Sequence, residues 1–404
     1  MTIISSVVGQ ALLLVSTVII GLCLSRLSRL QPELGCLLAG LGLSLLIPYW
    51  GIDSGVRADN LQPLIFYLLL PVLIFESCWH MQPAQLKRWL KTILCLAVPG
   101  VFIGCSLFAG VSYIAIGHSE GFPLIAALMA GAILSATDPS VIINQLKVLK
   151  TPADLRLLLE GESLFNDATS VALFSLLLGL ATTGMSDSTI ALTFLSSFFG
   201  GLLLGGVIGL VAAIVVLILG DHACTKIVLL FTAFISYYLS DQILPASGVM
   251  SVMGAALISR YCLRDHQHFI DDIDSTWQWL GLLTSSILFV LLGLVITLDM
   301  FVDQWLAMLI AIAAALLART ATVYGSARLS QAWQHSIVSE WRPIMIWGGL
   351  RGAIAIALVL SLPTSLPYWW TLQSMVFAVV LFNLVVQGTS LVWMKAVPTK
   401  PAHG

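Results

Sequence analysis

Apolar residues run along the chain in long continuous blocks separated by short polar segments. Thirteen of these blocks are long enough to cross a bilayer, which takes about 20 residues in a helix, with a range of about 17–25. They cover residues 6–24, 33–50, 61–80, 89–116, 122–148, 158–183, 188–220, 222–242, 246–262, 276–298, 304–328, 343–363 and 369–394. The strands of a transmembrane barrel would instead alternate with period two over about ten residues. The pattern therefore predicts an all-α polytopic membrane protein with thirteen transmembrane helices.

Composition agrees with this class. Of the 404 residues, 59% are hydrophobic and 9% are charged, whereas a soluble domain carries about 25% charged residues. These values exclude a soluble enzyme, a nucleic-acid-binding protein and a disordered chain. The seven cysteines lie mostly inside apolar runs and form neither a CxxC motif nor a cluster with histidine, so we interpret them as packing residues and expect no cofactor.

The polar segments are short, and the longest covers about 263–275. We expect one membrane domain over residues 1–404 with no soluble regulatory domain. The N-terminus has no basic region before the first apolar run, since the first arginine is Arg26, so no cleavable signal peptide is expected.

The basic residues between the spans define an orientation. With the N-terminus outside, fifteen of the eighteen basic residues fall on the cytoplasmic side and only Arg57 on the other, while Arg319 and Arg351 lie inside spans. The cytoplasmic set is Arg26, Arg29, Lys87, Arg88, Lys91, Lys147, Lys150, Arg156, Lys226, Arg260, Arg264, Arg328, Arg342, Lys395 and Lys400. Because membrane proteins collect positive residues on the cytoplasmic side, the pattern predicts N-out and C-in.

Several ionisable residues lie inside the predicted spans, where each costs at least about 2.5–3.5 kcal/mol. They are Glu76, Asp138, Glu162, Asp167, Arg319 and Arg351, with Glu160 at the mouth of the sixth span. Buried ion pairs explain some of them. Four acids and two arginines nevertheless leave at least two acids without a basic partner, which indicates a proton or cation site.

The sixth span carries most of this chemistry on one face. At about 100° per residue, Glu162, Ser163, Asn166, Asp167 and Ser170 fall within an arc of about 140°. This face offers oxygen ligands and one amide, which suit a hard monovalent cation or a proton rather than zinc or copper.

Two spans carry helix-breaking signals. In the fifth, Asp138 precedes Pro139, and Asp is a strong N-cap while Pro favours the first helical position. In the twelfth, Gly348, Gly349 and Gly352 surround Arg351. A simple proline kink and a close packing of small residues are the alternatives for these two places.

The positions of the two breaks fit an internal repeat. If spans 1–6 and 8–13 form two repeats, span 5 corresponds to span 12. Because the single span 7 lies between them, the two repeats enter the membrane from opposite sides and are inverted relative to each other. Paired broken helices in an inverted repeat indicate the midplane site of a secondary transporter.

Four motifs carry a resemblance to a known family. Gly161-Glu162-Ser163 with Phe165-Asn166-Asp167 resembles the Asn-Asp motif of NhaP/NHE-type sodium–proton antiporters. Residues 136–139 and 348–353 resemble the two unwound spans of that family, and residues 71–76 resemble its third-span motif. The thirteen-span count agrees, so the likeness covers nearly the whole chain.

The resemblance implies a role for each matching residue. Na⁺ and H⁺ would bind at Asp167, with Asp138, Ser163 and Thr137 completing the cation shell, Thr137 partly through its backbone oxygen. Asn166 would organise the crossing of the broken helices, and Glu162 would pair with Arg351. Glu76 and Glu160 would lie on the approach, and Arg319 would be an internal structural cation.

The family likeness also implies a homodimer in the plasma (inner) membrane. A transport part would be built around residues 60–183 and 276–363, and the remaining spans would form the dimerisation part. No nucleic acid and no small organic substrate are expected as partners. Asn166 stands where related electrogenic antiporters carry a second Asp, which suggests electroneutral one-for-one exchange.

Other functions remain open at this stage. A potassium–proton or lithium-tolerant antiporter of the same fold is the nearest, because a few oxygen ligands do not fix the choice of cation. A cation channel is a second alternative. An intramembrane protease is disfavoured, since Gly161-Glu162-Ser163-Leu164 lacks the second glycine of a GxSG serine site and no His lies deep in a span.

Overall fold

The structure is a computed structural model of an almost entirely helical chain. It describes residues 2–3, 7–50, 52–53, 58–81, 83–116, 122–139, 143, 146, 151–183, 190–244, 246–331, 333 and 336–390. Within these ranges, nine helical segments are long and apolar enough to cross a membrane, and three further apolar helices are shorter. The predicted all-α membrane class is confirmed, while the count of thirteen spans and their orientation stay predictions.

The first half of the described chain contains ten helical segments and a pair of short parallel strands. The strands are β1 (Thr2–Ile3) and β2 (Ile52–Asp53), and the helical segments are α1 (Val7–Ser28), α2 (Pro32–Leu46), the 3-10 turn η1 (Ile47–Trp50), α3 (Ala58–Leu64), the π-helical turn η2 (Ile65–Leu69), α4 (Leu70–Trp79), α5 (Pro83–Ala97), α6 (Pro99–Ala115), α7 (Leu124–Ile133) and α9 (Ala153–Thr183).

The elements of the second half of the described chain are all helical. Its elements are α10 (Ile190–Leu219), α11 (His222–Tyr238), the π-helical turn η4 (Leu239–Ile243), α12 (Gly248–Leu263), α13 (Gln267–Val295), α14 (Leu298–Asp303), α15 (Trp305–Ser330), the 3-10 turn η5 (Ser339–Trp341), α16 (Arg342–Trp347), α17 (Ala353–Leu360), α18 (Trp369–Phe382), the π-helical turn η6 (Asn383–Gln387) and α19 (Gly388–Ser390).

Several helix boundaries differ from the sequence prediction. The segment 89–116 is divided into α5 and α6 at Pro99, because proline has no N–H to continue the backbone ladder. The segment predicted to start at 276 starts earlier, since α13 begins at Gln267. Asp271, Asp272 and Asp274 lie in its second turn, and Asp272 and Asp274 pair with Lys226 of α11 and Arg260 of α12.

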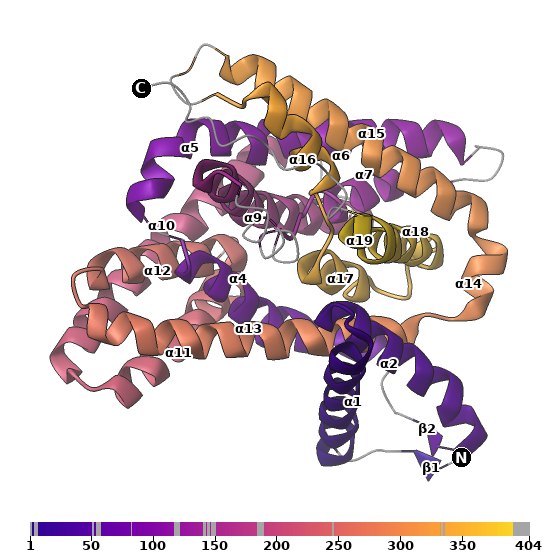
Figure 1. Cartoon of the computed structure of the whole chain (residues 1–404), viewed down its shortest axis with the longest axis horizontal. Helices are drawn as coiled ribbons and strands as arrows, with labels where there is room; N and C mark the ends of the chain where they lie inside the picture. Colours follow the sequence, from indigo (N-terminus) through magenta and orange to yellow (C-terminus); the bar gives the residue numbers. More distant parts are fainter. Residues whose placement is uncertain are drawn as a thin grey trace.

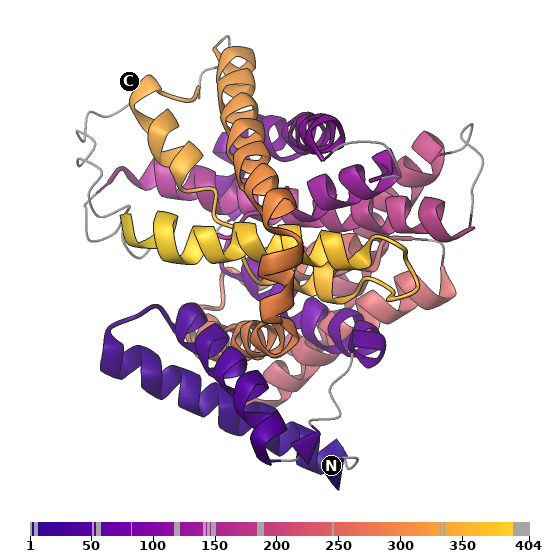
Figure 2. The ribbon, with the colours of Figure 1, turned by 90° about the vertical axis from the view of Figure 1, so that its right-hand side faces the viewer.

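The helices pack in two groups. In one, α10 and α11 pack on α12, α4 packs on α12 and α13, and α13 runs beside α2 and α1. In the other, α6 packs on α7 and α15, α5 packs on α9, and α18 packs on α15. Figures 1 and 2 show α1 and α2 at one extremity of the molecule, away from α5, α6 and α15. The groups meet where α9 and α17 contact α4, α12 and α13.

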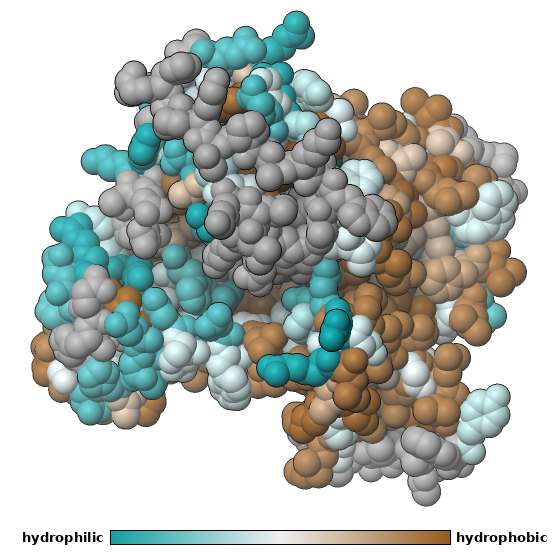
Figure 3. All heavy atoms as spheres, viewed as in Figure 1, coloured by the Kyte–Doolittle hydropathy of each residue, from teal (hydrophilic) through white to brown (hydrophobic). Residues whose placement is uncertain are grey.

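The surface is divided by hydropathy, as expected for a membrane protein. In Figure 3 hydrophobic side chains cover the right-hand side, where Figure 1 places α6, α14 and α15, and hydrophilic ones gather on the left. Large apolar side chains are exposed along α10, α14 and α15, including Leu203, Val207, Val302, Leu309 and Leu317. These belts face no other part of the described chain and fit contact with lipid.

Candidate cation site

The described part of the fifth predicted span ends in extended backbone. Helix α7 stops at Ile133, Leu134 and Ser135 form a turn, and residues 136–139 are neither helix nor strand. Because Asp138 precedes a proline, its backbone is disfavoured in helical geometry. The half-helix predicted to start at Pro139 lies outside the described residues beyond that position, apart from Ile143 and Leu146.

The twelfth predicted span is interrupted over residues 348–352. Helix α16 ends at Trp347, and α17 begins at Ala353, with Gly352 in an extended conformation before it. The two interruptions touch, because the N–H of Asp138 donates to the carbonyl oxygen of Leu350 at 2.7 Å. A Cβ at position 352 would collide with the Asp138 side chain, so glycine is needed for this approach.

Helix α9 presents its polar face to the first interruption. Asn166 accepts from the N–H of Thr137 at 3.4 Å and donates from its amide to the Thr137 hydroxyl at 2.7 Å. These two bonds satisfy backbone and side-chain groups that the broken helix leaves without a helical partner. The structure thus places Asn166 against residues 136–139.

Ser163 connects the same backbone to Asp167. Its hydroxyl lies 2.5 Å from the Thr137 carbonyl oxygen and 3.4 Å from Oδ2 of Asp167. Ser163, Asp167 and Thr137 are all buried, with 6–8% of their surface exposed. A carboxylate, a hydroxyl and a backbone carbonyl therefore converge on one point, with Asp138 as the next residue along the chain.

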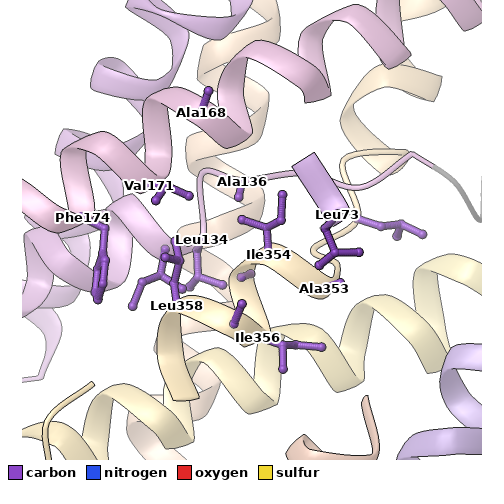
Figure 4. Packing of buried hydrophobic residues seen from close by; sticks show 14 of the residues in the cluster. Leu73, Leu134, Ala136, Ala168, Val171, Phe174, Ala353, Ile354, Ile356 and Leu358 are labelled. Atoms are coloured by element: carbon purple, nitrogen blue, oxygen red, sulfur yellow. The ribbon is translucent and has the colours of Figure 1, made fainter. Parts of the chain in front are cut away.

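Apolar side chains enclose this polar junction. Figure 4 shows Leu134 and Ala136 from the first interruption, Ala353 and Ile354 from α17, and Val171 and Phe174 from α9 packed together. Such surroundings strengthen the electrostatic interactions of a charged group, because they exclude water. A cation that enters must exchange its hydration shell for protein oxygens.

The structure corrects the predicted ion pair. Glu162 is paired with Arg319, not with Arg351: both guanidinium NH groups of Arg319 donate to the Glu162 carboxylate, the second at 3.0 Å. Arg319 lies on α15, and its side chain reaches Glu162 on α9. The Nε–H of Arg319 also donates to the carbonyl oxygen of Met345 at 3.0 Å, which fixes the guanidinium group. The planar fork of one arginine thereby occupies both carboxylate oxygens.

Arg351 lies nearby with a different role. Its guanidinium donates to the Gly349 carbonyl at 2.9 Å and, among the described residues, forms no ion pair. It lines a cavity of about 30 Å³ together with Ser135, Glu162, Asn166 and Arg319. A polar cavity of this size is large enough for one water molecule.

The two remaining acids lie on α4 and α9. Glu76 on α4 is 25% exposed and lies 3.5 Å from Nδ1 of His80, and its carboxylate rests against Gly281 of α13. Glu160 is half-buried on α9, before Gly161. No group of three or more His, Cys, Asp or Glu side chains suited to a resident metal occurs in the described ranges.

One contact at the junction has no sequence signal. The carbonyl of Leu350 holds Asp138 through backbone atoms, which no residue type reveals. The Glu162–Arg319 pair could have been proposed, because the count of buried charges allows either arginine as the partner.

The extended residues 136–139 that follow α7 touch the gap between α16 and α17, and a buried carboxylate lies beside them. This arrangement is typical of secondary transporters. A family model described as "Sodium/hydrogen exchanger, transmembrane" matches residues 12–396, and the chain belongs to this family. With its apolar helices, this makes it a multi-pass protein of the plasma membrane.

Individual relatives agree with this membership. The Na(+)/H(+) antiporter ApNhaP of Aphanothece halophytica is 32% identical over 363 residues, which cover 88% of this chain and 67% of that protein. The low-affinity antiporter NhaS1 of Synechocystis is 33% identical, and the match covers 64% of its length, so the chain spans about two thirds of these relatives. NhaP of Pseudomonas aeruginosa is 29% identical, and 91% of each chain is covered.

A solved structure shows the same fold. The sodium proton antiporter MjNhaP1 of Methanocaldococcus jannaschii superposes with a TM-score of 0.81 at 21% identity, covering 96% of this chain and 99% of that one.

Proposed function

We propose that this protein exchanges Na⁺ for H⁺ across the plasma membrane. The observation that carries the proposal is the buried Asp167 carboxylate beside the Ser163 hydroxyl and the Thr137 carbonyl. A carboxylate in such a site binds either a proton or a cation, because each neutralises the same charge. Competition for one group then couples the two fluxes without covalent chemistry.

The cation shell consists of Asp167, Asp138, Ser163 and the backbone oxygen of Thr137. The Ser163 hydroxyl donates to that oxygen. When a cation binds, the hydroxyl rotates so that both oxygens can face it. Oxygen ligands of this kind suit a hard monovalent cation.

Exchange requires that the site face each side of the membrane in turn. We propose thirteen spans with the N-terminus outside, the C-terminus inside and inverted repeats over spans 1–6 and 8–13. The placement of β1, β2 and α14 on one side in Figure 1 supports this topology, since the loop charges assign all three to the outside.

The packing favours a moving unit that differs from the one predicted from sequence. Helices α5, α6, α7, α9, α15 and α18 pack on one another, whereas α4 and α13 pack with α12. We assign α4 and α13 to the dimerisation part and α18 to the transport part, with the junction of α9 and α17 moving against α4 and α13. The active protein is a homodimer in this proposal.

Asn166 supports electroneutral exchange. Its amide stands one residue before Asp167 and adds no charge to the site. One cation then replaces one proton, and the moving part carries the same charge in both directions. A potassium–proton antiporter of the same fold is the alternative, because the same oxygens bind K⁺ if the cavity is wider.

The test is a transport assay with the full chain in proteoliposomes. With an internal pH dye and an imposed proton gradient, Na⁺ added outside is expected to release protons, and K⁺ and Li⁺ are tested in parallel. Proton release with K⁺ alone would replace the sodium assignment by the potassium one. No cation-dependent release with any of the three ions would reject antiport.

A further inference from the structure

The last described span contains a buried polar pair that the cation site does not use. Asn383 and Gln387 begin and end the π-helical turn η6 and are 3% and 2% exposed. Such π-turns inside α-helices are rare and recur at functional sites. Together with Arg319, Gly349 and Arg351 the pair lines a cavity of about 10 Å³.

Asn383 holds the second interruption through its side chain. Its partners orient the amide so that the oxygen accepts from the Arg351 N–H at 2.7 Å and the nitrogen donates to the Val379 carbonyl at 3.1 Å and to Oε1 of Gln387. The Arg351 N–H lies within the gap between α16 and α17, where no helical carbonyl is in place to accept it.

The bond reaches the cation site through a single peptide group. The N–H of the Leu350–Arg351 peptide is bound by Asn383, and the C=O of the same peptide accepts from the Asp138 N–H at 2.7 Å. Asn383 and the backbone of Asp138 are therefore joined by two hydrogen bonds in series across one rigid planar unit.

The arrangement repeats what Asn166 does at the first interruption. Asn166 accepts from the Thr137 N–H, and Asn383 accepts from the Arg351 N–H. If spans 1–6 and 8–13 are the two repeats, the first asparagine lies in span 6 beside broken span 5. The second then lies in the equivalent span 13 beside broken span 12.

We propose that Asn383 is a positioning residue for cation binding, the counterpart of Asn166 in the second repeat. It fixes the Leu350–Arg351 peptide, which in turn fixes Asp138 beside Asp167. This inference rests on the proposed function, because its kinetic effect is seen in transport. Without Asn383 the oxygen atoms that bind the cation are still present, but their backbone is no longer held in place before the cation arrives. Cation binding must then order the site, so the KM for Na⁺ should rise more than kcat falls.

The experiment compares three variants of the full chain. Asn383→Leu keeps the size and removes the acceptor. Asn383→Asp keeps an acceptor oxygen in a cavity that Arg319 and Arg351 also line. Gln373→Leu is the matched control, because Gln373 is a fully buried amide of the adjoining α18 whose polar atoms have no hydrogen-bond partner among the described residues.

Transport and amide exchange are both measured. For Asn383→Leu we expect a KM for Na⁺ raised about tenfold with kcat changed less than about threefold, as for a buried N–H that loses its acceptor. Asn383→Asp keeps the acceptor for the Arg351 N–H but loses the amide donor to Val379 and Gln387, so its KM should rise less than that of Asn383→Leu. Gln373→Leu should stay within about threefold of the unmodified protein. Hydrogen–deuterium exchange in detergent should quicken over residues 134–139 and 348–352 in Asn383→Leu only.

Three results would overturn the proposal: an unchanged KM in Asn383→Leu, equal shifts in Asn383→Leu and Gln373→Leu, or unchanged amide exchange in both segments. If Asn383→Leu does not fold, Asn383→Ser replaces it with the same expectations, since its hydroxyl is too short to reach Arg351. Absence of transport in the unmodified protein would reject the proposed function alone, because the amide exchange comparison would still decide the role of Asn383.

Discussion

Arg319 of α15 and Glu162 of α9 form a bidentate ion pair, and their side chains are only 6% and 2% exposed. The pair lies one turn from Asn166 and ties the helix that carries the cation site to a neighbouring helix of the transport part. This pair, rather than one with Arg351, balances the Glu162 charge.

Removing one partner of this pair should destabilise the protein strongly. Glu162→Gln or Arg319→Ala strands a buried charge, which costs about 3–5 kcal/mol. Arg351→Ala removes a cation that no carboxylate pairs within the described residues, so its loss should cost less. Thermal unfolding in detergent measures the loss of stability in each variant and so ranks the three substitutions.

Arg328→Ala is the matched control for this prediction, because Arg328 lies on the same helix α15 with an exposed side chain. It should unfold like the unmodified protein. A larger effect of Arg351→Ala than of Arg319→Ala would contradict the pairing described here.

Asp167→Asn should abolish cation-dependent proton movement and leave the fold intact. The amide has nearly the same shape but takes up no proton at neutral pH and carries no negative charge for a cation to neutralise, so the competition between proton and cation disappears. Proteoliposome transport measures the loss, and thermal unfolding checks the fold. Asp299→Asn, at an exposed position in α14, should transport normally. Exchange at the normal rate in Asp167→Asn would remove the central carboxylate from the mechanism.

Membrane voltage should not shift the cation gradient at which exchange stops. If one Na⁺ replaces one H⁺, no net charge crosses per cycle. If one net charge crossed the membrane per cycle, the voltage would contribute about 2.3 kcal/mol per 100 mV to the exchange, and the cation gradient at which exchange stops would shift clearly. The reversal point is measured in liposomes clamped with valinomycin and K⁺, with Na⁺ as substrate. A reversal point that follows voltage would show that a second group, such as Asp138 or Glu76, carries a proton of its own.

Gly281→Ala should weaken cation uptake from the side that Glu76 faces. A Cβ at position 281 would lie 2.8 Å from Cδ of Glu76 and would displace the carboxylate from α13. If Glu76 attracts the entering cation, the KM for Na⁺ on that side rises while the Asp167 site is unchanged. Gly110→Ala is the control, because a Cβ there meets no atom within 4 Å. Equal KM values for Na⁺ in Gly281→Ala and Gly110→Ala would show that Glu76 does not attract the entering cation.

The local parts of the site could be predicted from the sequence. Ser163, Asn166 and Asp167 share a face because helical periodicity places them there, and Asp138 before Pro139 carries its own cap and break signal. Thr137 is brought to this face by that break. Each of these sequence patterns involves only a few neighbouring residues, so it can be recognised without knowing how the helices pack. The structure places these residues next to one another.

The long-range parts could not be predicted. The choice of Arg319 over Arg351 depends on how α15 is rotated against α9, which a pattern of apolar residues does not fix. Likewise Gln373, Asn383 and Gln387 are similar polar interruptions of one apolar span, yet only Asn383 reaches the backbone of the second break. Tertiary packing decides which of the three reaches that backbone.

The backbone bond between Asp138 and Leu350 also has a consequence for biogenesis. Its donor lies in the first half of the chain and its acceptor in the second, so the ribosome delivers the two at different times. Until the twelfth span is inserted, the Asp138 N–H is exposed either to lipid, which cannot accept a hydrogen bond, or to water that enters the half-built bundle. A nascent chain arrested before residue 343 should therefore keep this interruption hydrated and open to water-soluble thiol reagents at an engineered cysteine in residues 134–136, and completion of the chain should close it.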